Sequence, residues 1–389
     1  MRIALISRRF DSIGGGTERD LLITAQILAE AGHQVTVYAN EVRSQHRDLM
    51  VRRINALPLG RAVTLLNFGF RAASLARRDG AELVVSFARA AYPDIVRSGG
   101  GAHASYLRAA RRWQSPARWA AMRMNPYHRA QIALERASFK LPWFRCAIAV
   151  SEFVRQDLLK TFALNPSQVV TLYNGVDLKR FAPNRDKSFA ERIRRQLEIP
   201  EDSRTVAFIG HGFARKGLKF LLAAWPLIDK RAQLIVVGND RTGIYRRLAD
   251  RLSVGDRVLF LGARADVASL LAAIDGMALP SLFEPFGNVV LEAMAAGVPA
   301  LCSKQTGAAE LIPPELHELI VANPTDPNEL AQCLNVLLAL SGDASKLARA
   351  TAEQYTWDRY GTELLRIISN AGKRVDSSLE APSTSLSDV

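Results

Sequence analysis

The chain of 389 residues has only three cysteines, Cys146, Cys302 and Cys333. They are far apart in the sequence, and their spacing matches neither a metal site nor a disulfide framework. Each lies in an apolar run, so we expect buried thiols in a reducing cytoplasm. Long apolar runs are also missing, because Arg8 and Arg9 interrupt the first one and no stretch approaches the roughly 18 apolar residues of a membrane-spanning helix. We therefore expect neither secretion nor membrane insertion.

Acidic residues are scarce in the first half of the chain. The whole sequence has 51 Lys and Arg against 38 Asp and Glu, a net charge of +13. Residues 1–160 hold 25 of the basic and 12 of the acidic residues, whereas the remainder holds 26 of each. The whole excess of positive charge therefore lies in the first half.

The segment 97–145 carries much of this excess. It contains ten basic residues, a single acid (Glu135) and three of the five tryptophans, Trp113, Trp119 and Trp143. Basic residues interleaved with aromatic ones suit an anionic membrane surface, at about 1 kcal/mol per Lys or Arg close to it. The same composition is compatible with nucleic-acid binding or with a solvated charged face.

Short β-rich runs alternate with segments of helical period. Strands without polar alternation, separated by helices, predict parallel sheets covered on both faces. A turn-rich stretch at 174–184 divides the runs into two series. We therefore predict an α/β protein of two Rossmann-like domains that face each other across a cleft. The runs lie at 2–7, 34–39, 82–87, 146–150 and 168–173, and then at 205–210, 233–238, 257–262, 276–280 and 298–302.

The same division predicts the domain boundaries. We expect an N-terminal domain over 1–173, a C-terminal domain over 174–356, and a helix over 357–375 that packs back on the first domain. The Ser-, Pro- and acid-rich segment 376–389 predicts a disordered tail. Ligands of such sheets bind at the carboxyl ends of the strands, so the loops after the strands are where chemistry is expected.

The loop after the first expected strand reads DSIGGGTERD (11–20). Gly15 and Gly16 would let backbone amides approach a phosphate, and the N-terminus of the next helix would add partial positive charge. The loop is not a dinucleotide fingerprint, because the third glycine of that motif would fall at Arg19. A plain glycine turn is an equally good interpretation of this motif alone. Asp20 would face either the cleft or solvent.

A second loop, GHGFARKGLKF (210–220), follows the first strand of the second series. Arg215 and Lys216 lie just before an expected helix and suit a diphosphate, since Arg donates a bidentate fork and Lys supplies a point charge. Leu218 occupies the position of the P-loop lysine, which disfavours an ATPase. The alternative is a solvated basic turn, which the expected position beside the cleft disfavours.

The most specific segment is PSLFEPFGNVVLEAMAAGVP (280–299). Glu284 would lie in the loop after a strand, and Glu292 in the helix that follows. Free amides near Gly287, Asn288 and Val289 could hold hydroxyls or phosphate oxygens, while the carboxylates accept hydrogen bonds from sugar hydroxyls. Two acids at this spacing alone more often belong to a solvated helix face.

Four motifs in order resemble those of glycosyltransferase family 4: GGGTERD, NGVD at 174–177, GFARKG at 212–217 and EPFGNVVLEAMAAGVP at 284–299. That family comprises retaining glycosyltransferases with the GT-B fold. The resemblance covers roughly residues 1–372 and is greatest to lipopolysaccharide core glucosyltransferases. Their glycine loop also ends in Arg-Asp, and their pyrophosphate loop also reads Arg-Lys-Gly. The run of three glycines departs from the family's usual two.

The resemblance implies a role for each motif in binding the donor. Glu284 would bind hydroxyls of the donor sugar, and Glu292 the ribose of the nucleotide. Arg215 and Lys216 would neutralise the diphosphate leaving group. The amides of the glycine loop would approach the phosphates and the sugar.

Further residues follow from the resemblance outside these motifs. His103, in RSGGGAHASYL, is similar to the family's active-site histidine near the sugar. Asp20 would lie on the acceptor side of the cleft, and Arg264 would lie where the family reads the base. Asn174 of NGVD would shape the hinge between the domains.

The function implied is the transfer of a hexose, which we expect to be glucose, from a UDP-sugar to a lipopolysaccharide core or related lipid-linked acceptor. The acceptor-side position of the segment 97–145 favours an anionic membrane over nucleic acid, so we expect a peripheral protein on the inner face of the cytoplasmic membrane. No Asp-x-Asp pair occurs, so we expect neither a metal ion nor another cofactor. Two alternatives remain: a nucleotide-sugar epimerase of similar fold, and a catalytically idle protein that binds membrane or nucleic acid.

Overall fold

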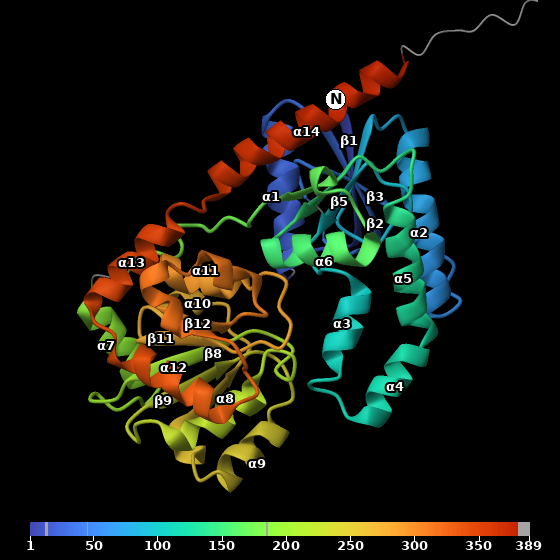
Figure 1. The fold of residues 1–389 in the computed structure, drawn as a ribbon. Coiled ribbons are helices and arrows are strands. Elements are labelled where there is room, and N and C mark those ends of the chain that lie inside the picture. The colour runs from blue at the N-terminus through green and yellow to red at the C-terminus, as the bar shows by residue number, and fades with distance from the viewer. Residues whose placement is uncertain (12–14, 45, 184–185, 380–389) are drawn as a thin grey trace, which may run out of the picture.

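The protein folds into two α/β domains, each built on a parallel sheet with helices on both faces (Figure 1). The structure, a computed structural model, describes residues 1–11, 15–44, 46–183 and 186–379. The first sheet has seven strands in the order β3-β2-β1-β4-β5-β6-β7, and the second has six in the order β10-β9-β8-β11-β12-β13. The predicted pair of Rossmann-like domains is confirmed.

The N-terminal domain alternates strands and helices, except that β3 follows β2 and β5 follows β4 without a helix between them, and that three helices, α3, α4 and α5, lie between β5 and β6. Its strands are β1 (Arg2–Phe10), β2 (Gln34–Val42), β3 (Met50–Arg53), β4 (Leu83–Ser86), β5 (Ile95–Ser98), β6 (Cys146–Ala149) and β7 (Val169–Thr171). Its helices are α1 (Gly16–Glu30), α2 (Arg61–Arg78), α3 (His103–Ala110), α4 (Pro116–Met124), α5 (Pro126–Ser138) and α6 (Glu152–Phe162).

The C-terminal domain repeats this alternation with shorter helices. Its strands are β8 (Thr205–Ile209), β9 (Gln233–Val237), β10 (Val258–Gly262), β11 (Gly276–Leu279), β12 (Ala300–Ser303) and β13 (Ile320–Val321). Its helices are α7 (Lys187–Gln196), α8 (Leu218–Ala224), α9 (Gly243–Arg251), α10 (Val267–Leu271), α11 (Asn288–Ala295), α12 (Pro327–Ala339) and α13 (Gly342–Ala352), and short 3-10 turns include Gly307–Leu311.

A last helix, α14 (Trp357–Leu379), leaves the C-terminal domain and runs along the N-terminal one (Figure 1). Tyr360, Leu364, Ile367 and Ile368 are buried in the same core cluster as Leu21 of α1. Their spacing of three and four residues places them on one helix face, which explains why this helix packs against another domain.

Several details differ from the expectations. The strands β3, β5 and β13 were not anticipated, because each is short and two of them carry polar or charged residues. The expected tail begins too early, since α14 continues to Leu379, and the rest of it lies outside the described residues. Cys302 is buried, but Cys146 and Cys333 are only half-buried, so the expectation of three buried thiols was wrong for two of them.

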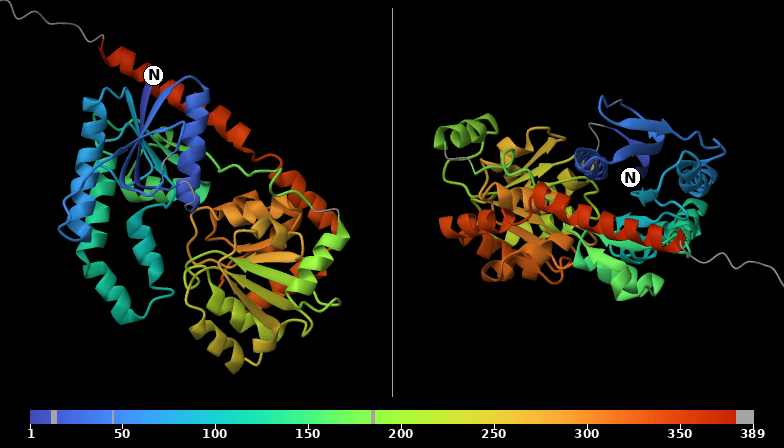
Figure 2. Two further views of the ribbon diagram at one scale, coloured as in Figure 1. Left: turned by 180° about the vertical axis from the view of Figure 1, so that it is seen from behind. Right: turned by 90° about the horizontal axis from the view of Figure 1, so that it is seen from above.

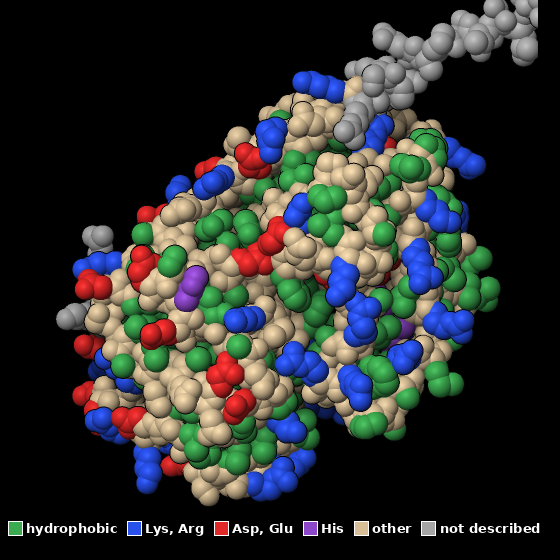
Figure 3. All heavy atoms as spheres, viewed as in Figure 1, with side chains coloured by type: hydrophobic (Ala, Val, Ile, Leu, Met, Phe, Trp, Pro, Cys, Tyr) green, Lys and Arg blue, Asp and Glu red, His purple; other side chains and the backbone are tan. Residues whose placement is uncertain are grey.

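The helices α3 and α4 form an arm that projects from the N-terminal domain beside the C-terminal domain (Figures 1 and 2). None of the residues of α4 is buried. Lys and Arg side chains gather over this region with few acidic neighbours, whereas the face of the C-terminal domain mixes both signs (Figure 3). Within the described residues, no helix combines the length and apolar character needed to cross a membrane.

Candidate active site

Glu284 is the centre of a buried charge cluster at the carboxyl ends of two inner strands, β8 and β11, of the C-terminal sheet. One of its oxygens, Oε2, lies 2.7 Å from Nζ of Lys216 and 2.8 Å from Nη1 of Arg215. Arg215 also donates to the carbonyl of Phe283 over 2.7 Å. Burial alone would raise the pKa of Glu284, but Lys216 and Arg215 lower it to about 2. The carboxylate is therefore ionised at neutral pH, and two fixed cations stand beside it.

Backbone geometry brings these groups together. Arg215 and Lys216 follow β8, and Glu284 follows β11, which is the neighbour of β8 in the sheet. Gly217 has a φ of +86°, and a Cβ there would lie 2.0 Å from the carbonyl oxygen of Pro280. Only glycine fits this position, so the sequence Lys-Gly allows the cationic loop to approach the Glu284 loop closely.

The segment around Glu284 faces the N-terminal domain. The side chain of Phe283 lies 3.4 Å from the position of a Cβ on Gly101, and its ring meets that of Tyr106 at a centroid distance of 6.1 Å. Ser151 donates a hydrogen bond of 2.7 Å to the carbonyl of Pro285. The charge cluster is thus at the junction of the domains, where ligands of paired α/β domains bind.

Glu292 makes a contact that the sequence did not indicate. Its Oε1 lies 2.9 Å from Nη1 of Arg19, which comes from α1 of the other domain. Burial raises the pKa of Glu292, while Arg19 acts in the opposite direction. In this structure the carboxylate expected to meet a ribose joins the two domains.

Asp20 lies in a buried polar network rather than on an open acceptor surface. Its Oδ2 accepts from Nη2 of Arg97 over 3.0 Å and from Nδ2 of Asn174 over 3.2 Å. Asn174 in turn donates to Oδ1 of Asn288 over 2.8 Å. The other carboxylate oxygen, Oδ1, is buried without a hydrogen-bond partner among the described residues. Arg97 thus compensates the charge of Asp20 in this structure, and Asn174 connects Asp20 to Asn288 of the other domain. The acceptor-side position of Asp20 and the hinge role of Asn174 stay predictions.

His103 is the first residue of α3 and is buried. Its backbone N–H donates to the carboxylate of Glu135, and its Nε2 lies 2.9 Å from Nδ1 of His128. Burial lowers the pKa of His103 to about 3, with help from the charges of Arg89 and His128. The imidazole is therefore uncharged at neutral pH, and it can donate a hydrogen bond from one ring nitrogen and accept one at the other.

The remaining predicted residues lie at different distances from the cluster. A Cβ on Gly16 would lie 3.5 Å from Nδ2 of Asn288, so the glycine loop meets the start of α11, which includes Val289. Gly15 is the N-cap residue of α1, and Gly287 is the N-cap residue of α11. Arg264 is not joined to the cluster: its guanidinium hydrogen-bonds Asp266 in its own loop.

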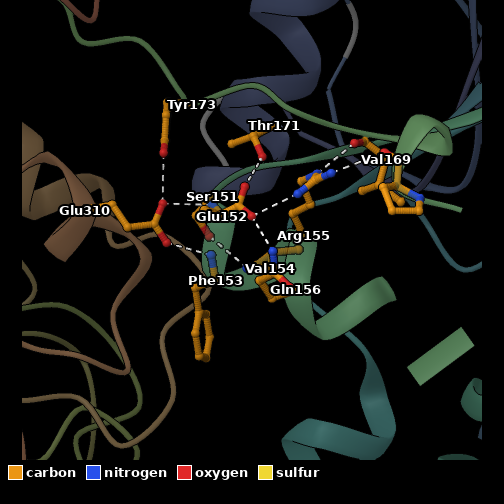
Figure 4. Close-up of polar contacts among 11 residues, drawn as sticks. Ser151, Glu152, Phe153, Val154, Arg155, Gln156, Val169, Thr171, Tyr173 and Glu310 are labelled. Carbon is orange, nitrogen blue, oxygen red and sulfur yellow. Dashed lines mark hydrogen bonds and ion pairs between the residues drawn. The ribbon is translucent and has the colours of Figure 1, made fainter. Parts of the chain in front are cut away.

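Glu310 fixes a second junction between the domains (Figure 4). Its carboxylate accepts the backbone N–H groups of Glu152 and Phe153 over 2.8 and 2.6 Å, and the hydroxyl of Tyr173 over 3.0 Å. A residue of the C-terminal domain therefore caps the N-terminus of α6, where a negative charge is favoured. This contact lies beside Ser151, which donates a hydrogen bond to Pro285 in the loop that carries Glu284.

Three of these residues, Arg19, His128 and Glu310, were not identified from the sequence. Arg19 stands within the GGGTERD motif beside Asp20, so its position was a usable signal. His128 and Glu310 had no local signal, because their partners are more than twenty residues away in sequence. Among the described residues, no group of three or more His, Cys, Asp or Glu could hold a metal ion. The expectation of metal-independent chemistry stays a prediction.

The protein has two α/β domains with parallel sheets, and a carboxylate and two cations lie at the junction of these domains. A model of Glycosyltransferase Family 4 matches residues 14–180, and one of Glycosyl transferases group 1 matches residues 203–339. Together the two matches cover most of the chain. The chain therefore belongs to the glycosyltransferases with the GT-B fold.

Individual relatives are similar over part of their length. The lipopolysaccharide glucosyltransferase WaaG of Escherichia coli K12 is 27% identical over 223 residues, which are 56% of this chain and 60% of WaaG. The D-inositol 3-phosphate glycosyltransferase of Salinispora tropica is 32% identical over 235 residues, which are 55% of this chain and 48% of that protein. The chain thus spans about half the length of the curated relatives it matches.

Solved structures match over nearly the whole chain. A crystal structure of WaaG has a TM-score of 0.80 at 23% identity and covers 94% of this chain and 99% of WaaG. HepE of Anabaena, in complex with UDP-glucose, has a TM-score of 0.71 at 20% identity and covers 95% of this chain and 100% of HepE. At these identities the likeness shows the fold.

Proposed function

We propose that the protein is a retaining glycosyltransferase that moves a hexose, glucose in the first instance, from a UDP-sugar to a lipopolysaccharide core or related lipid-linked acceptor. The observation that carries this proposal is the contact of Glu284 with Arg215 and Lys216 at the domain junction. Breaking a sugar–phosphate bond builds negative charge on the departing diphosphate, which two fixed cations stabilise. WaaG, by its name a lipopolysaccharide glucosyltransferase, supports the choice of sugar and acceptor.

The cluster has parts suited to both halves of such a donor. The diphosphate would bind Arg215 and Lys216, which contact Glu284 in this structure. The Glu284 carboxylate would then accept hydrogen bonds from sugar hydroxyls. The N-terminus of α11 at Gly287 and Asn288 would offer backbone amides to the same ligand. His103 would meet the sugar as a neutral ring, and the acceptor would attack from the face that the diphosphate leaves.

Donor binding tests this proposal directly. A panel of nucleotide-sugars is compared by thermal stabilisation and by slow hydrolysis of the donor, and UDP-glucose is expected to give the largest effect in both. Ligand at 100 times its dissociation constant stabilises the folded state by about 2.7 kcal/mol. If no nucleotide-sugar stabilises the protein or is hydrolysed, the proposed activity is wrong. Hydrolysis that persists unchanged in EDTA supports the metal-independent reaction, and its loss contradicts it.

We propose further that the segment 97–145 places the protein on the inner face of the cytoplasmic membrane. The arm presents exposed Arg118, Arg123 and Met124 on α4, so an anionic bilayer meets cations and an apolar side chain together. Neither a cofactor nor a nucleic acid belongs to this proposal.

Vesicle binding tests the membrane proposal. Sedimentation with vesicles should increase with the fraction of anionic lipid and decrease with salt, and R118E together with R123E should weaken it strongly. The matched control is R192E with R195E on α7, which makes the same change of charge on the C-terminal domain. Equal effects of the two double variants, or binding indifferent to lipid charge, would contradict a specific role of the arm.

A further inference from the structure

Two helices from different domains meet beside Glu292. A Cβ on Gly16 of α1 would lie 3.5 Å from Nδ2 of Asn288, the first residue of α11. One turn further along each helix, Nη1 of Arg19 lies 2.9 Å from Oε1 of Glu292. Residues three or four positions apart share a helix face, so one face of α1 meets one face of α11 (Figure 1). The contact of Arg19 with Glu292 therefore follows from the packing of the two helices.

Arg19 has one ionic partner among the described residues, and that partner is Glu292. The acidic neighbours of Arg19 on α1 are paired elsewhere. Glu18 lies 3.9 Å from an arginine of β1, and Asp20 lies 3.0 Å from Arg97. The side chain of Arg19 is only 30% exposed. A helix thus places its guanidinium, and that guanidinium is committed to a single carboxylate of the other domain.

The Glu292 carboxylate can still accept hydrogen bonds while it is paired. Its Oε2 accepts none from the described part of the chain, and 17% of the side chain is exposed. A carboxylate has about four lone-pair sites, and Arg19 uses one of them with a single hydrogen bond. The two neighbouring hydroxyls of a ribose can therefore donate to the same carboxylate without displacing the arginine.

The charge of Glu292 depends on its neighbours. Burial raises the pKa of this carboxyl group, Arg19 and then Arg180 lower it, and the carboxylate of Asp20 raises it. Hydrogen bonds to an ionised acceptor are roughly twice as strong as those between neutral groups, and a protonated acid loses part of its accepting capacity. Arg19 therefore favours the form of Glu292 that binds hydroxyls best.

We propose that Arg19 is a positioning residue for donor binding, which from the N-terminal domain orients the Glu292 carboxylate toward the ribose hydroxyls of the nucleotide. The inference rests on the proposed function, because its ligand is the nucleotide of the donor. Arg19 itself touches no part of that nucleotide, and its effect passes through Glu292. Recognition of the ribose by the C-terminal domain thus depends on a side chain of the opposite domain.

Two ligands separate this role from general damage to the protein. UDP and 2′,3′-dideoxy-UDP share the base and the diphosphate, but only UDP has the ribose hydroxyls. The ratio of their dissociation constants, measured by calorimetry at pH 7, therefore reports the hydroxyl contacts alone. We expect the wild type to prefer UDP by about tenfold or more, and R19Q to lose about tenfold of that preference. R19K keeps the charge and should lose less than about threefold.

E310A is the matched control, because Glu310 also joins the two domains but contacts α6 instead of α11. It should change the affinity for both ligands equally and so keep the ratio of the wild type.

The pH dependence of the ratio is a second measurement. The preference for UDP should decrease in acid as Glu292 is protonated. The midpoint of this decrease should lie at a higher pH in R19Q, because loss of the guanidinium raises the pKa of Glu292 further. The preference of R19Q should therefore recover toward that of the wild type as the pH rises.

The possible results separate this inference from the proposed function. The inference is overturned if R19Q keeps the ratio or the pH midpoint of the wild type, if E310A alters the ratio as much as R19Q, or if R19K is as low as R19Q. Tighter binding of UDP by R19Q would also overturn it, because Arg19 would then compete with the ribose. A wild type that binds neither ligand overturns both proposals. The expected ratios without hydrolysis of any nucleotide-sugar refute the transferase activity and leave the role of Arg19 in nucleotide binding intact.

Discussion

Replacing Glu284 by Gln removes one negative charge and keeps nearly the same volume. Lys216 and Arg215 would then lie, largely buried, with no anion between them. The carboxyl group has a pKa of about 2 in the folded protein against an ordinary 4.5. At about 1.4 kcal/mol per pKa unit, its ionised form contributes roughly 3 kcal/mol to folding.

The sign of this contribution fixes its pH dependence. Because the pKa is lowered by folding, the stabilisation is fully present above pH 4.5 and is lost as the pH falls from 4.5 toward 2. The variant E284Q should therefore be less stable than the wild type at pH 7 by roughly 3 kcal/mol, and the difference should shrink in acid. For a domain of 150–250 residues this corresponds to a decrease in Tm of roughly 6–12 °C.

Thermal unfolding at pH 7, with and without UDP, measures the effect. A bound diphosphate supplies the negative charge that the variant lacks, so UDP should raise the Tm of E284Q more than that of the wild type. E363Q is the matched control, because Glu363 pairs with Arg366 at an exposed site and its loss should cost less than about 0.5 kcal/mol. A Tm of E284Q equal to that of E363Q would refute the electrostatic reasoning, and an equal response to UDP would refute the diphosphate site.

Three further outcomes are expected. K216A should decrease kcat far more than stability, because Lys216 meets the leaving group; a loss of stability as large as the loss of kcat, compared on one free-energy scale, would contradict this role. E310A leaves the first amides of α6 and the hydroxyl of Tyr173 without their acceptor, so it should cost about 1–3 kcal/mol in thermal unfolding, and Y173F less; equal costs would be inconsistent with the cap. In an NMR titration, the ring of His103 should stay neutral until the pH falls close to its lowered pKa of about 3. The contribution of the neutral ring to folding stability is therefore fully present above pH 6.5 and is lost as the pH falls toward 3. Protonation of His103 near pH 6.5 in the folded protein would contradict its burial.

Local patterns in the sequence were sufficient to predict the fold and the proximity of Arg215, Lys216 and Glu284. Apolar strands between amphipathic helices are determined by the residues themselves, so the two sheets and the helix Arg61–Arg78 could be predicted from the pattern alone. Arg215, Lys216 and Glu284 each follow a strand, and parallel strands place their carboxyl ends on one edge. Their meeting was therefore predictable without distances.

Contacts between the domains were decided only by the tertiary structure. Glu292 was expected to bind a ribose, and in this structure it pairs with Arg19 of the other domain. Glu310 caps a helix whose first residue is 158 positions away in sequence. A local motif specifies the type of side chain and its position on its own element, whereas the partner of a charge depends on how two independently formed sheets pack. Sequence alone thus identified the groups that could meet a nucleotide-sugar, and the packing of the domains determined which of them are already held by one another.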